Sequence, residues 1–74
     1  MTLPRTGDVL VIGPRASVQF SRPFRFRVIR VDLRSSCEGW IWIEGYQLGR
    51  DGQATERRNL FVQLAGLTRA SRPD

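Results

Sequence analysis

Arginine and aromatic residues alternate through two neighbouring stretches of the chain, and together they could bind an anionic polymer. The stretch FRFRVIRVDLR (24–34) carries four arginines, and the stretch WIWIEGY (40–46) carries two tryptophans and a tyrosine. Flat aromatic side chains stack on nucleic-acid bases, and guanidinium groups neutralise phosphates. This combination of residue types favours a surface that binds single-stranded DNA or RNA.

Groups that could perform catalysis or hold a metal ion are sparse. The absence of histidine removes the commonest general base and the Ser-His-Asp arrangement. Cys37 is the only cysteine, so it has no second thiol with which to pair or to bind a metal. Glu44 stands among the aromatics as a single carboxylate, which is half of an acid–base pair. We therefore expect no enzyme activity, no cofactor and no metal.

Length and charge set the class of the protein. Seventy-four residues suffice for one domain, and its net charge of +5 comes from arginine alone on the basic side. A domain this basic suggests an acidic partner such as nucleic acid. The single cysteine and the lack of a long apolar run predict a soluble cytoplasmic protein that does not engage a membrane.

The sequence predicts short β-strands as the elements that position these side chains. VLVIG (9–13) is an apolar run between turn residues, and ASVQF (16–20) is either a short strand or an extended loop. In the stretch 24–34 the alternation changes parity at Val28-Ile29, which a β-bulge would explain, and every apolar side chain would then face inward. Strands over 40–48 and about 55–64 follow, and Leu67 anchors a last short one. We expect a flexible arm at 1–6, one β domain at 7–68 and a frayed tail at 69–74.

Two turns predict how these strands pair. Asp51-Gly52 is typical of a two-residue type I′ hairpin, and a connection centred on Cys37 joins the preceding pair of strands. The hairpin pairs Tyr46 with Arg57, Glu44 with Asn59, Ile43 with Leu60, Trp42 with Phe61 and Ile41 with Val62. The connection pairs Leu33 with Ile41, Val31 with Ile43, Arg34 with Trp40, Asp32 with Trp42 and Arg30 with Glu44. Both registers place the same apolar residues on one face.

The opposite face of this predicted three-stranded sheet is the candidate binding surface. It interleaves cations with aromatic rings, and its candidate residues are Arg25, Arg27, Arg30, Arg34, Trp40, Trp42, Tyr46, Arg57 and Phe61. Two other interpretations remain open. The face could be covered by the N-terminal arm, by residues 14–20, or by a protein partner or second copy that buries Trp40, Trp42 and Phe61. The arginines could also serve only as cation–π and ion-pair partners within the fold.

The opening stretch TGDVLVIGP (6–14) resembles the start of SH3-like small barrels, including KOW-type nucleic-acid-binding modules. The resemblance covers these residues only, because RASVQFSRP (15–23) stands where a KOW motif has a further glycine. No functional residue is transferred on this basis. With the strand count, the resemblance implies an all-β fold: a small five-stranded antiparallel barrel, SH3-like or OB-like, or alternatively an open, strongly bent antiparallel sheet.

Overall fold

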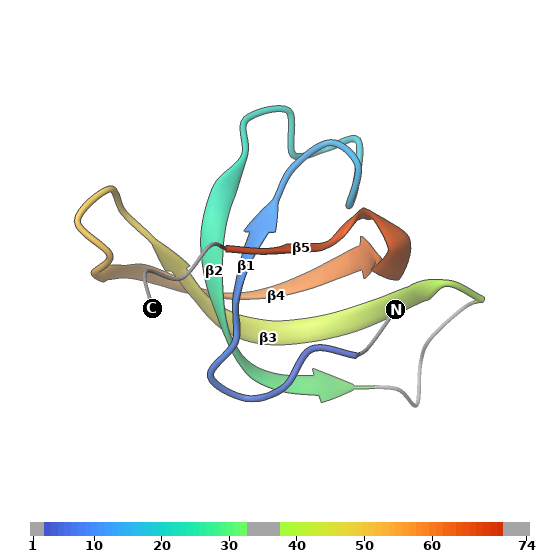
Figure 1. Cartoon of the computed structure of the whole chain (residues 1–74), viewed down its shortest axis with the longest axis horizontal. Helices are drawn as coiled ribbons and strands as arrows, with labels where there is room; N and C mark the ends of the chain where they lie inside the picture. Colours follow the sequence, from blue (N-terminus) through green and yellow to red (C-terminus); the bar gives the residue numbers. More distant parts are fainter. Residues whose placement is uncertain (1–2, 33–37, 71–74) are drawn as a thin grey trace.

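The computed structural model describes residues 3–32 and 38–70, which form a single antiparallel sheet (Figure 1). Its elements are β1 (Val9–Ile12), β2 (Phe24–Asp32), β3 (Trp40–Leu48), β4 (Ala54–Gln63), a 3-10 turn (Leu64–Gly66) and β5 (Thr68–Arg69). The five strands lie in the order β4-β3-β2-β1-β5, so β1 to β4 form a meander and β5 returns to pair with β1. The all-β class is confirmed, and the sheet is open, as in the alternative expectation, because β4 and β5 form its two edges.

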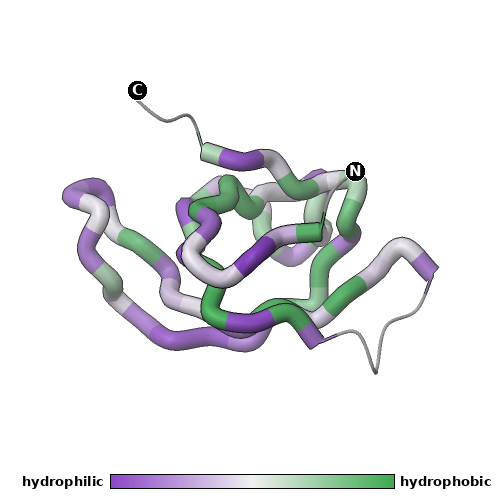
Figure 2. The backbone as a smooth tube through the Cα atoms, turned by 60° about the horizontal axis from the view of Figure 1, so that its bottom comes forward, coloured by the Kyte–Doolittle hydropathy of each residue, from purple (hydrophilic) through white to green (hydrophobic). Residues whose placement is uncertain are grey.

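The core lies on the inner face of this bent sheet. Alternate residues of the strands point into it, as a half-buried sheet requires. The buried core residues are Leu10, Ile12, Ala16, Phe20, Phe26, Val28, Ile41, Ile43, Leu60, Val62 and Leu67. The hairpin between β3 and β4, at the left of Figure 2, is largely hydrophilic and extends away from this core. The sheet thus presents one apolar face inward and leaves a second face for other contacts.

The predicted β-bulge in β2 is confirmed. Val28 pairs with Gly45 while Arg30 pairs with Glu44, so Ile29 is the extra residue. Its backbone carbonyl accepts a hydrogen bond of 2.7 Å from the Thr6 hydroxyl, which connects the N-terminal segment to the bulge. Ile29 itself is only half-buried and is not among the core residues, which corrects the expectation that every apolar side chain of this stretch faces inward.

The hairpin between β3 and β4 differs from the predicted two-residue turn. A type I′ turn needs positive φ at both central residues, but only Gly52, at φ +82°, is in that region. Gly49 instead accepts a hydrogen bond from the Gly52 amide and donates one to Gln53, which closes a three-residue loop. Further along β4, Thr55 is an extra residue between the pairs Leu48–Ala54 and Gln47–Glu56. This shift of one residue restores the strand pairing that a two-residue loop would have given. The predicted pairs from Ile41 to Tyr46 are therefore confirmed although the turn type was wrong.

The positive φ of Gly52 carries a prediction for stability. Nothing lies within 4 Å of a Cβ built at Gly52, so an added methyl group would meet only backbone strain. Gly52→Ala should cost about 1–2 kcal/mol, the usual penalty for a side chain in the left-handed region. Thermal unfolding would detect this as a Tm about 4–16 °C lower. An unchanged Tm would mean that the loop adopts another conformation at no cost.

Residues 13–23, between β1 and β2, cover the core where the sheet does not close. Ala16 and Phe20 are buried there, and the Ala16 carbonyl accepts a hydrogen bond of 2.7 Å from the Gln63 amide at the end of β4. The Arg58 guanidinium of β4 lies 5.5 Å from the ring centroids of both Phe20 and Phe24. This segment therefore forms loop structure that covers the inner face, with no strand between 16 and 20.

Candidate functional site

The outer face of β2, β3 and β4 carries the candidate residues at the positions that the registers predicted. Asp32, Trp42 and Phe61 lie opposite one another across the three strands, and so do Arg27, Tyr46 and Arg57. Residues directly opposite in an antiparallel pair point to the same side of the sheet, so these groups share one face. Arg34 and its predicted pairing with Trp40, as well as the pairing of Leu33 with Ile41, lie outside the described residues.

One end of this face holds an aromatic cluster, which we define as Trp40, Trp42 and Phe61. The rings of Trp40 and Phe61 are stacked at a centroid distance of 5.3 Å, and those of Trp42 and Phe61 are tilted at 5.1 Å. Trp42 is 40% exposed, while the other two are half-buried. The cluster is thus rigidified by its own ring contacts and offers the indole of Trp42 to solvent.

The segments that could have covered this cluster lie elsewhere. Thr6 of the N-terminal segment donates to the Ile29 carbonyl, and Phe20 of the β1–β2 segment packs edge-on against Phe24, 5.4 Å between centroids, on the inner face. Among residues 3–32 and 38–70, neither segment buries Trp42. No segment of the described part of the chain therefore covers the exposed indole of Trp42.

The middle of the face holds an arginine clamp, which we define as Glu44 with Arg30 and Arg57. Nε of Arg57 donates to Glu44 Oε2 at 2.9 Å, with Nη2 of Arg57 on the same oxygen, and Nη2 of Arg30 lies 3.2 Å from Oε1. The hydrogen bond from Arg57, reinforced by the charges of both guanidinium groups and opposed by partial desolvation, lowers the pKa of Glu44. The same hydrogen bond raises the pKa of Arg57. One carboxylate therefore partly neutralises two of the candidate cations.

The lowered pKa of Glu44 predicts a pH-dependent contribution of the clamp to stability. The contribution is complete above the unfolded pKa of about 4.3 and is lost as the pH falls through the lower folded value. Glu44→Gln should therefore melt a few degrees below the wild type near neutral pH, a small effect because exposed ion pairs are screened. The difference should close as the pH is lowered through the folded pKa of Glu44, which lies below the unfolded value. Thermal unfolding across this range measures it, and a difference that does not vary with pH would exclude a role for the charge.

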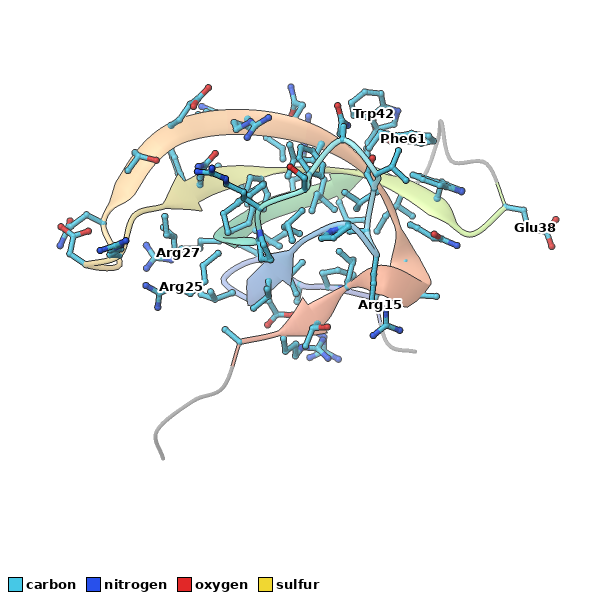
Figure 3. All side chains as sticks on the ribbon, turned by 90° about the horizontal axis from the view of Figure 1, so that it is seen from above. Arg15, Arg25, Arg27, Glu38, Trp42 and Phe61 are labelled. Atoms are coloured by element: carbon cyan, nitrogen blue, oxygen red, sulfur yellow. The ribbon has the colours of Figure 1, made fainter. Side chains whose placement is uncertain are left out.

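Arg25 and Arg27 occupy the other end of the face, beside the hairpin. Figure 3 shows them well apart from Trp42 and Phe61. Nη2 of Arg25 donates to the carbonyls of Gly49 and Arg50 at 3.2 and 3.1 Å. No hydrogen bond or ion pair of the Arg27 side chain occurs among the described residues. The eight candidate residues that the structure describes therefore do not make one uniform patch.

Two further features of the site escaped the sequence reasoning. Leu48 has the parity of the outer face, yet it is buried, because the bent sheet brings it into a cleft with Arg25 and Arg27. Arg58 has inner-face parity and packs against phenylalanine rings, which the strand alternation could have indicated.

In the described part of the chain, no three His, Cys, Asp or Glu side chains gather as metal ligands. No helix within residues 3–32 and 38–70 is long and apolar enough to cross a membrane.

Comparison with known proteins adds no relative. A scan against protein-family models, a search of curated proteins and a search of solved structures each found no match.

Proposed function

We propose that this chain is a non-catalytic module that binds single-stranded DNA or RNA on the outer face of its sheet. The observation that carries the proposal is the aromatic cluster, in which Trp42 is 40% exposed and held by its contact with Phe61. Each base stacked on such a ring contributes about 1–3 kcal/mol, and the ring accepts any base because every base has a flat face. The net charge of +5 supplies the long-range attraction.

A groove beside Trp42 supports the same proposal. It has a volume of about 250 Å³ and is lined by Arg30, Asp32, Trp42, Ile43, Glu44 and Asn59. A base stacked on Trp42 would place its polar edge towards these carboxylate, amide and guanidinium groups. Hydrogen bonds there would orient the base, while stacking would provide most of the binding free energy.

Titration of the chain with oligonucleotides at low salt tests this proposal. Both tryptophans of the sequence belong to the aromatic cluster, so intrinsic fluorescence reports directly on the site. We expect quenching that saturates with single-stranded oligothymidylate or oligouridylate, and affinity that falls steeply as salt is raised. The absence of any fluorescence or anisotropy change at low salt would reject the proposal.

The second candidate function is a protein-interaction or self-association module. The observation that favours it is the continuous contact of Trp40, Phe61 and Trp42, which makes an apolar surface of three rings. The free edge of β4 is a poorer interface, because Glu56, Arg57 and Arg58 place charges along it. Sedimentation over a range of protein concentrations distinguishes the two functions. A monomer whose fluorescence responds to oligonucleotide alone favours nucleic acid.

Two finer assignments belong to the same proposal. The meander of β1–β4 with β5 returning to β1 supports kinship with SH3-like barrels more than with OB-like ones. The single cysteine supports a cytoplasmic setting as part of the proposal, since secreted domains of this size commonly rely on disulfides.

A further inference from the structure

The arginines of the outer face fall into two electrostatic classes. Arg30 and Arg57 both contact the Glu44 carboxylate, so the clamp has a net charge close to that of one cation. Among residues 3–32 and 38–70, Arg25 donates only to neutral backbone carbonyls, and Arg27 makes no ion pair. Within this part of the chain, unneutralised positive charge on the outer face is therefore concentrated at its hairpin end.

These two arginines line a cleft, which we call the arginine cleft. Its volume is about 360 Å³, and its lining residues are Gly7, Val9, Arg25, Arg27, Leu48, Gly52 and Ala70. Val9 and Leu48 provide apolar contact for the arginine stems, an arrangement that leaves the charged heads near water. Gly7 and Gly52 contribute backbone without side chains, and a Cβ built on either would meet open space. The cleft is accessible and positively charged.

We propose that the arginine cleft binds the phosphodiester backbone of the same single strand whose bases stack on the aromatic cluster. This inference rests on the proposed function and divides its surface into two parts. The aromatic cluster would supply stacking, which is insensitive to salt. Arg25 and Arg27 would neutralise phosphates and release counterions, so they would carry the salt dependence. The clamp between them, with its charge already partly compensated, would contribute less.

The spacing along β3 sets how long a nucleic-acid strand must be to reach both the aromatic cluster and the arginine cleft. Arg27 lies opposite Tyr46 and Arg25 opposite Leu48, whereas the aromatic cluster surrounds Trp42. At about 3.3 Å per strand residue, the two parts are about 13–20 Å apart along β3. With about 3.4 Å per stacked nucleotide, a strand needs about four to six nucleotides to span them. Shorter strands would occupy one part alone.

The decisive experiment compares Arg27→Gln with Arg15→Gln in oligothymidylate titrations between about 50 and 200 mM salt. Arg27→Gln should bind a strand of about twelve nucleotides about three- to fivefold more weakly. The slope of log affinity against log salt should become shallower by about 0.7. Arg15→Gln removes the same charge from an exposed position that Figure 3 shows apart from both parts, so it should retain the wild-type slope. Arg27→Lys, which keeps the charge, should also retain it.

Strand length provides the second measurement. With a strand of about three nucleotides, tryptophan quenching should give the same affinity for Arg27→Gln and wild type, because it reports on the aromatic cluster alone. The difference should appear as the strand lengthens beyond about six nucleotides. Equal slopes for Arg27→Gln and Arg15→Gln, or a defect independent of length, would overturn the arginine cleft as a phosphate site. Either result would leave the proposed function intact if long strands still quench tryptophan fluorescence. Circular dichroism checks that each variant folds.

Discussion

Trp42→Ala should weaken binding of single-stranded nucleic acid by about 5- to 150-fold. The loss corresponds to about 1–3 kcal/mol, the range measured when an aromatic side chain that stacks on a base is truncated. Trp42 presents its exposed indole to solvent and contacts Phe61, so the substitution removes the stacking surface and leaves the buried core untouched. The salt dependence should remain that of the wild type, because no cation is removed. Fluorescence anisotropy of a labelled oligonucleotide measures both quantities.

A matched control for this substitution lies on another part of the molecule. Val18 is 90% exposed in the β1–β2 segment and is apolar, so Val18→Ala removes exposed apolar surface away from the aromatic cluster. It should bind as the wild type does. If Trp42→Ala bound oligonucleotide normally but lost self-association, the aromatic cluster would be a protein interface and the second candidate function would stand in place of the first.

Gly45→Ala should destabilise the fold by about 3 kcal/mol or more, which lowers the Tm by more than about 12 °C in a domain of this size. Gly45 is buried in β3 opposite the bulged part of β2. A Cβ at this position would overlap the Arg27 carbonyl oxygen and come within 2.7 Å of Cε2 of Phe26. The Arg27 oxygen is backbone in the neighbouring strand, so the clash can be relieved only by moving β2. Thermal unfolding followed by circular dichroism measures the effect.

Gly49→Ala is the comparison for this prediction. Its Cβ would lie 3.3 Å from atoms of the Asp51 and Thr55 side chains, which can shift, and its φ is not in the left-handed region. We expect a change within about 1 kcal/mol. A small effect of Gly45→Ala, similar to that of Gly49→Ala, would show that β2 and β3 are not held as closely as the structure has them. Truncating Phe26 should not rescue Gly45→Ala, because the closer obstacle is the backbone.

The pairing of β2, β3 and β4 was predictable because each strand has a clear alternation. The parity change at Val28-Ile29 indicated a bulge, and the Asp51-Gly52 pair indicated the position of the hairpin. These are local signals, and side-chain alternation reports on burial within each strand. Together they predict Trp42 opposite Phe61 and Arg30 opposite Glu44, which are the pairs found in the structure.

The division of the candidate site into two parts depends on long-range geometry that these signals do not contain. Strand alternation assigns Arg25 and Trp42 to the same face, but bending and coiling of the sheet decide how far apart they lie. Leu48 illustrates the point, because its outward parity predicts exposure while the bend buries it. Glu44 could be paired with Arg30 from the register, whereas its second contact, with Arg57, is diagonal in the sheet and depends on side-chain conformation.

The hairpin between β3 and β4 has a consequence for how this sequence could change over evolutionary time. Its three-residue loop and the extra residue at Thr55 offset the register in opposite senses. Losing one residue from the loop would leave the Gly49–Gln53 pair in place, and losing Thr55 would only turn the bulge into a regular ladder. Neither change moves the pairs from Gln47 back to Trp40, so Leu60 would still face inward and Phe61 outward. Single-residue changes in length can therefore accumulate at this end of the hairpin while the aromatic cluster and the core keep their positions.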